Sequence, residues 1–213
     1  MPYLSEFLIL ASIHFLAVVV PGPDFAVVVQ NSISYGRKIG VITALGIGTG
    51  ISVHVLYTIL GFGLLLQTHP FIFSVIQIIS ALYLAYLGIQ LIYSNLKKLN
   101  EADQISISTS PPNKVISKKA AFLKGFVTNA TNPKATVFFL GIFTTVVSQT
   151  TPLSVQFTYG VWMCMVNALW FIVVAYLFTL NHIRMVFLQR KKWFEITMGI
   201  ILIALALRLF ITI

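Results

Sequence analysis

Two charged side chains, Asp24 and Lys134, lie beside prolines inside otherwise apolar runs of the sequence. Asp24 ends the motif PGPD (residues 21–24), and Lys134 follows Pro133 in the stretch FVTNATNPKATVFF. A proline in a helix interior removes a backbone donor and clashes with the preceding turn, at about 3 kcal/mol or more. An aspartate at the centre of a membrane helix costs about 2.5–3.5 kcal/mol on insertion scales. Residues this costly in apolar surroundings indicate a binding or transport site.

The composition places both motifs in a membrane protein. Of the 213 residues, 58% are hydrophobic and only 9% are charged, and the mean hydropathy is +0.93. Soluble domains carry roughly 25% charged residues, so a soluble chain this apolar would lack the polar surface to cover itself. The net charge of +9 does not indicate nucleic-acid binding, because the basic residues are confined to short connections between apolar runs. The N-terminal segment lacks a basic region typical of a cleaved signal and is expected to be a retained span.

Six apolar stretches are long enough to cross a bilayer, which requires about 20 residues each. Twelve of the fourteen lysines and arginines lie in the first, third and fifth connections between them. The positive-inside rule makes that face cytoplasmic, so both termini are expected outside. The predicted spans are Leu4–Val29, Ile39–Leu66, Phe71–Tyr93, Phe122–Val147, Leu153–Leu180 and Trp193–Ile213.

The predicted fold is all-α, a single transmembrane domain over residues 1–213. It consists of two three-helix halves, about 1–93 and 122–213, joined by a cytoplasmic loop at about 94–121. An odd number of spans per half makes the halves enter the membrane from opposite sides, as in inverted repeats whose broken helices meet at a site near the bilayer midplane. The two proline motifs lie in the first span of each half and are expected to form that site.

The chemistry of the two motifs is complementary. Asp24 falls in the first turn after Pro23, where the positive end of a helix favours an anion. Asn129 and Asn132 can satisfy carbonyls freed by the second break, and Lys134 supplies a cation. We hypothesise that Asp24 and Lys134 pair, or bind the ammonium and carboxylate of a substrate. Two alternatives remain open: a simple proline kink with Asp24 as helix cap, and a Lys134 side chain that reaches the headgroups.

The same motifs resemble the LysE/RhtB family of amino-acid exporters. The matching segments are PGPDF, SYGRKIG, ALGIGTG, AYLGIQL, AFLKGFVTNATNPKATVFF and ALRLF, in the family's order over nearly the whole chain, whereas GIFTTVVSQ departs from the family's proline–glutamine–phenylalanine pattern. The resemblance implies a six-helix secondary exporter of amino acids or their derivatives in the bacterial inner membrane, driven by the proton motive force. By position, it implies a functional core of Pro21, Gly22, Pro23, Asp24, Asn129, Asn132, Pro133 and Lys134.

Other polar or small residues inside the spans have two interpretations each. His54 is a candidate proton relay or a hydrogen-bonded core residue, and Asn167 is a candidate substrate contact or an interhelical hydrogen-bonding group. His14 is expected to be a core residue. Gly46 and Gly50 have the small-xxx-small spacing that lets helices approach closely, either within the bundle or at a homodimer seam.

Other function classes have less support. Efflux of a metal cation or another small solute would require a thiol, imidazole or carboxylate cluster, and a membrane-embedded enzyme would require a catalytic constellation. Neither pattern occurs in the sequence, nor does a phosphate-binding loop of the kind found in ATP-driven pumps. We therefore expect a secondary transporter rather than an enzyme, with no cofactor, no catalytic residue and no metal ligand. Its expected partners are an amino-acid substrate, protons and lipids.

Overall fold

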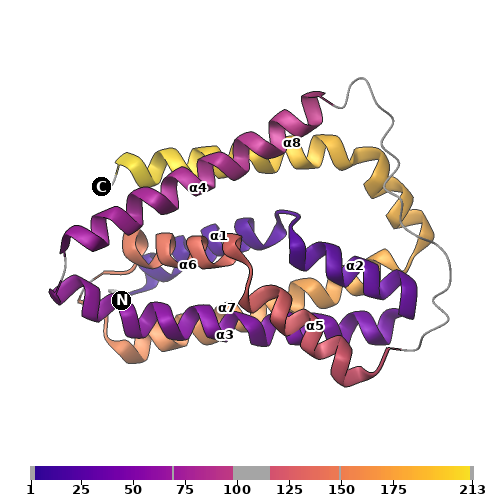
Figure 1. Ribbon diagram of the computed structural model, residues 1–213, viewed down its shortest axis with the longest axis horizontal. Helices are drawn as coiled ribbons and strands as arrows, with labels where there is room; N and C mark the ends of the chain where they lie inside the picture. Colours follow the sequence, from indigo (N-terminus) through magenta and orange to yellow (C-terminus); the bar gives the residue numbers. More distant parts are fainter. Residues whose placement is uncertain (1–2, 69, 98–115, 149, 212–213) are drawn as a thin grey trace.

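A computed structural model describes residues 3–68, 70–97, 116–148 and 150–211 of the chain. These residues form helices joined by short connections, with no strand among them, which confirms the all-α prediction. Most of the predicted cytoplasmic loop, residues 98–115, lies outside the described residues. The helices are α1 (Leu4–Val19), α2 (Pro23–Tyr35), α3 (Arg37–Thr68), α4 (Pro70–Lys97), α5 (Lys118–Ala130), α6 (Pro133–Val146), α7 (Leu153–Phe178) and α8 (Asn181–Ile211) (Figure 1).

The first predicted span is broken at the PGPD motif. Helix α1 ends at Val19 and α2 begins at Pro23, and the two axes differ by 53°. Pro21 disfavours helical backbone at the preceding residue, and Val20 is accordingly extended, with φ −60° and ψ 121°. Pro23 takes the first helical position of α2, where a missing amide hydrogen costs nothing. Two prolines therefore stop one helix and start the next within four residues.

A second break divides the predicted fourth span. Helix α5 ends at Ala130, and α6 begins at Pro133. Asn132 adopts an extended backbone before the proline, with φ −74° and ψ 111°, and its side chain accepts a hydrogen bond from the Lys134 amide. Proline and asparagine thus produce a defined helix start. Both breaks lie near the middle of the molecule's long axis (Figure 1).

The helix lengths agree with part of the predicted topology. Helices α3, α4 and α7 are each long and apolar enough to cross a membrane, and the bent α1–α2 pair qualifies as a fourth span. Helix α6 has 14 residues, or roughly 21 Å at 1.5 Å per residue, which is short of a 30 Å hydrocarbon core. The sixth predicted span lies within α8. The six-span count remains a prediction.

The helices form a closely packed group and an outlying pair. Helix α3 packs along α5 and α7, and α4 packs along α8. In Figure 1 the α4–α8 pair runs along one edge and contacts the remainder mainly through α6. Helix α1 begins and α8 ends at one end of the molecule, whereas α3, α5 and α8 begin at the other. The described basic connections therefore gather at one end, as the positive-inside prediction requires.

Small residues set the contact between α3 and α5. A methyl group on Gly46 would overlap the Phe122 carbonyl, and one on Gly125 would overlap the Thr43 carbonyl. Gly50 faces Asn129 in the same way, because a Cβ built on Gly50 would lie 2.9 Å from the Asn129 Cβ. Of the two interpretations of the GIGTG spacing, the structure therefore favours packing within the bundle.

Replacement of Gly125 by alanine is expected to destabilise the protein, because the added methyl group forces α5 away from α3. We expect the melting temperature in detergent to fall by several degrees. Gly61→Ala is the matched control, because a Cβ there meets nothing within 4 Å and alanine is a better helix former than glycine. Equal melting temperatures for the two variants would contradict the close α3–α5 contact.

A single residue connects α2 to α3. Gly36 has φ 85°, a left-handed conformation that glycine adopts without the steric cost borne by other residues. Its carbonyl accepts hydrogen bonds from the Ile39 and Gly40 amides in the first turn of α3. The connection between these two helices is therefore short and well defined.

Candidate functional site

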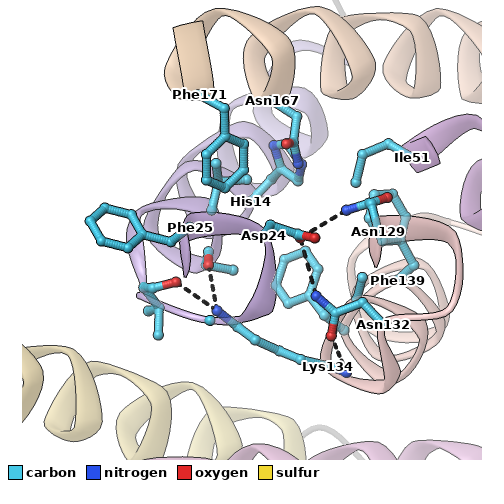
Figure 2. A pocket seen from close by; sticks show the side chains of 16 residues that line it. His14, Asp24, Phe25, Ile51, Asn129, Asn132, Lys134, Phe139, Asn167 and Phe171 are labelled. Atoms are coloured by element: carbon cyan, nitrogen blue, oxygen red, sulfur yellow. Dashed lines mark hydrogen bonds between the residues drawn. The ribbon is translucent and has the colours of Figure 1, made fainter. Parts of the chain in front are cut away.

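The two helix breaks meet at a buried pocket. It is lined by residues from α1, α2, α3, α5, α6 and α7 and from the α1–α2 and α5–α6 breaks (Figure 2). Ile51, Phe138 and Phe139 belong to one apolar cluster of the protein and Phe171 to the other, so the pocket lies where the two clusters meet. Its cavity measures about 40 Å³ as the space open to the centre of a water molecule. A water molecule needs about 10–15 Å³ in this measure, so there is room for a few waters.

Asp24 projects from the first turn of α2 toward the second break. Its Oδ2 accepts hydrogen bonds from the side-chain amides of Asn129, at 2.9 Å, and Asn132, at 3.1 Å (Figure 2). The side chain is 9% exposed. Two amides from α5 and its C-terminal connection therefore hold a buried carboxylate that belongs to α2, and the two proline motifs are joined directly.

Lys134 reaches in the opposite direction, from α6 to the end of α1. Its Nζ donates to the carbonyls of Ala17, at 3.2 Å, and Val20, at 2.9 Å. These carbonyls are left without helical partners where α1 stops, and a cation at a helix C-terminus is favoured by the helix dipole. Lys134 and Asp24 line one pocket, but each makes its hydrogen bonds to other groups.

The two helices that begin at the pocket differ in capping. The α6 start is capped by the Asn132 side chain, which accepts from the Lys134 amide at 3.0 Å. The α2 start has Gly22 as its N-cap and no side-chain cap. The first amides of α2 therefore have neither helical partners nor a capping side chain. A Cβ built on Gly22 would lie 3.7 Å from Lys134 Nζ, so these amides and the ammonium occupy the same side of the pocket.

Several polar atoms at the pocket have no hydrogen-bond partner among the described residues. They are Asp24 Oδ1, Asn129 Oδ1, Asn167 Oδ1 and both ring nitrogens of His14. Each belongs to a residue that lines the pocket and is at least nine-tenths buried. An unpaired buried polar atom costs about 1–3 kcal/mol, so the cluster indicates that a polar ligand or water binds here.

The two secondary candidates from the sequence have different placements. Asn167 lines the pocket. His54 lies behind Asn129, outside the lining residues, where Nε2 contacts the Asn129 carbonyl at 2.8 Å and Nδ1 contacts the Tyr57 hydroxyl at 2.8 Å. Because a carbonyl only accepts, Nε2 carries the hydrogen, and a neutral ring would accept from Tyr57. This arrangement fits the core interpretation of His54, and the proton-relay role remains a hypothesis.

His14 and four phenylalanines of the pocket lining were not predicted as site residues. His14 projects from α1 and is 1% exposed, with its ring packed against Phe138, Phe139 and Trp162. Phe25, Phe138, Phe139 and Phe171 also line the pocket. The sequence feature that could have indicated His14 is its position seven residues before Pro21, on the same broken span. No such feature marks the phenylalanines, because the chain contains seventeen.

The donor set of the site does not resemble a metal centre. Among the residues that the structure describes, no three histidine, cysteine, aspartate or glutamate side chains are grouped closely enough to hold a metal ion. The pocket instead offers one carboxylate, one ammonium, one imidazole and several amides. This combination suits an organic zwitterion better than a metal cation.

Comparison with known proteins gives the same class. The family model described as LysE type translocator matches residues 15–212. The chain is 32% identical over 193 residues to the threonine efflux protein of Escherichia coli (strain K12), covering 90% of this chain and 91% of that protein. It is 31% identical over 192 residues to the threonine efflux protein of Salmonella typhi, covering 90% of this chain and 91% of that protein. The leucine efflux protein of Salmonella choleraesuis is 32% identical over 135 residues, 63% of this chain and 60% of that protein.

None of the solved structures matches the chain. The family model covers nearly the whole sequence, including both proline motifs, and the relatives are named as efflux proteins. The expectation of a transporter rather than an enzyme is thereby confirmed, as is the family that the motifs indicated. The chain belongs to the LysE family of translocators.

Proposed function

We propose that this protein exports amino acids across the bacterial inner membrane as a secondary transporter, with its substrate site at the pocket between the two helix breaks. The observation that carries the proposal is the buried Asp24 carboxylate, which has one unpaired oxygen facing a pocket that also contains a buried ammonium. The names of the threonine and leucine efflux relatives support an amino-acid substrate.

The pocket matches the two charges of an amino acid. The substrate ammonium would bind Asp24 Oδ1 and Asn129 Oδ1, which are unpaired acceptors. The substrate carboxylate would bind the uncapped amides at the start of α2 and the third hydrogen of Lys134 Nζ, whose other two hydrogens go to α1 carbonyls. Helix N-termini at discontinuous helices are recurrent carboxylate sites in transporters.

The size of the cavity supports a change of shape during transport. An apolar cavity of about 150 Å³ binds benzene, a smaller molecule than threonine, whereas the cavity here is about 40 Å³. An amino acid therefore requires the pocket to widen. Alternating access meets this need if the two halves rock about the breaks, opening the pocket first to the cytoplasm and then outward. The end that carries the basic connections is the cytoplasmic end in this proposal.

Counterflow in proteoliposomes tests the proposal. Purified protein is reconstituted into liposomes loaded with unlabelled threonine or leucine, and entry of the same labelled amino acid is measured with and without a pH gradient. We expect accumulation above protein-free liposomes, and faster net efflux when the gradient drives protons against the substrate. Absence of counterflow for a panel of all common amino acids would overturn an amino-acid substrate. Net efflux that does not respond to the pH gradient would overturn proton coupling alone.

A further inference from the structure

His14 and Asn167 form a polar wall of the pocket that is not needed to bind the ammonium and carboxylate of an amino acid. The groups assigned above to the substrate ammonium and carboxylate are Asp24, Asn129, Lys134 and the start of α2. His14 from α1 and Asn167 from α7 line the same pocket. In Figure 2 they lie on the α7 side of the Asp24 carboxylate, and Lys134 lies on the opposite side. They therefore face the part of a bound amino acid that remains, its side chain.

Both residues are buried with hydrogen-bonding capacity unused. His14 is 1% exposed and Asn167 is 4% exposed. The two ring nitrogens of His14 and the Oδ1 of Asn167 have no hydrogen-bond partner among the described residues. The imidazole is enclosed by Phe138, Phe139 and Trp162, with ring centroids at 6.1, 5.9 and 5.7 Å. The two phenylalanines have no polar group, and the Trp162 indole makes a ring contact without a hydrogen bond to His14, so the pocket is the direction from which a partner can come.

The chemistry of the pair specifies its partner. A neutral imidazole offers one N–H donor and one nitrogen acceptor, and the asparagine carbonyl oxygen is a further acceptor. A hydroxyl group donates one hydrogen and accepts others, so it can satisfy both residues at once. An apolar side chain would exclude water and leave the polar atoms of both residues without hydrogen bonds. A charged side chain would find no opposite charge on this wall.

We propose that His14 and Asn167 are specificity-determining residues that select amino acids with a hydroxyl-bearing side chain over apolar side chains of the same shape. The proposal rests on the proposed amino-acid export and deepens it. A site that hydrogen-bonds a substrate hydroxyl rejects the analogue that lacks it, because the site's own polar groups then remain unpaired. Phe25 and Phe171, also at the pocket, would pack against the aliphatic part of the substrate.

Threonine and valine are the probes, because a hydroxyl in one replaces a methyl group in the other at nearly equal volume. Counterflow of each labelled amino acid is measured in proteoliposomes, and the ratio of the two initial rates at low substrate concentration is the readout. We expect wild-type protein to favour threonine at least about tenfold. His14→Phe and Asn167→Leu remove the polar groups at similar volume, and we expect each to bring the ratio to within about twofold of one.

Two further variants separate selection from folding. His14→Gln retains a donor and an acceptor, and its ratio is expected to recover to more than half of the wild-type value. Thr58→Val is the matched control, because Thr58 is also buried with an unpaired hydroxyl but lies outside the pocket lining, and its ratio is expected to equal that of the wild type. Melting temperatures of all variants in detergent identify a folding defect.

The outcomes distinguish this inference from the proposed function. Wild-type protein that transports threonine and valine equally would overturn the inference and leave amino-acid export standing. The inference also fails if His14→Phe and Asn167→Leu fold and keep the wild-type ratio. If wild-type protein moves no amino acid at all, it is the proposed function that fails.

Discussion

Replacement of Asp24 by asparagine is expected to reduce amino-acid efflux strongly while the protein still folds. The asparagine oxygen can still accept the hydrogen bonds from Asn129 and Asn132 that Asp24 Oδ2 accepts at present. The position of the unpaired Oδ1 would be taken by an amide nitrogen, which donates and cannot bind a substrate ammonium. A hydrogen bond to a charged group is worth about 1.5–3 kcal/mol, so the initial rate of counterflow at low substrate concentration should fall by about 10- to 150-fold.

Glu6→Gln is the matched control for this charge removal. Glu6 is also a carboxylate on the first broken span, and it accepts hydrogen bonds from the Ser148 amide and the Thr151 hydroxyl, away from the pocket. We expect this variant to transport within about twofold of wild type. Both variants should still melt cooperatively in detergent, and the melting temperature of Asp24→Asn, which leaves the Lys134 ammonium without a nearby carboxylate, should fall by less than that of Lys134→Met, described below. Undiminished counterflow by Asp24→Asn would show that the carboxylate does not bind substrate.

Replacement of Lys134 by methionine is expected to abolish efflux and to destabilise the protein more than Asp24→Asn does. The Ala17 and Val20 carbonyls would lose the donor that now satisfies them, at about 1–3 kcal/mol for each unpaired buried group. The buried Asp24 would also remain without the nearby ammonium. Loss of one member from a buried pair of charges typically costs about 3–5 kcal/mol. Counterflow should fall below detection, and the melting temperature should drop by several degrees.

A double variant separates the two causes of destabilisation. Asp24→Asn combined with Lys134→Met removes both charges, so it should regain the part of the stability loss that came from an isolated carboxylate. It should not regain transport, because both proposed substrate contacts are gone. Lys119→Met, at an exposed lysine in the first turn of α5, is the control for loss of one positive charge. A double variant as unstable as Lys134→Met would show that the two charges do not stabilise one another.

Sequence reasoning located the two helix breaks because the residues there are costly in apolar surroundings. Prolines and charges in apolar runs have few harmless explanations, and all eight residues assigned by family resemblance lie at the two breaks that form the pocket. The helical class followed from composition for the same reason, since apolar chains must satisfy their backbone groups internally. Composition and motifs do not predict which hydrogen-bond partner each polar side chain has.

The hydrogen bonds of Asp24 and Lys134 illustrate that limit. The sequence suggested a direct pair, whereas each side chain bonds to the opposite break: Asp24 to asparagines from the second, Lys134 to carbonyls at the first. The choice depends on how four helix ends converge, which local sequence does not encode. His14 was overlooked as a site residue because an isolated histidine in a span is more often a core residue, and only its unpaired nitrogens distinguish it.

The one-residue connection at Gly36 limits how the protein can move. Helix α3 begins directly after Gly36, which follows the last residue of α2, and the two helices pack against each other, so we expect them to move together. If the two halves rock as proposed, the two helix breaks at the pocket, residues 20–22 and 131–132, would be the hinges. The residues that bind the substrate would then also be the residues about which the helices rotate when the substrate is released outward.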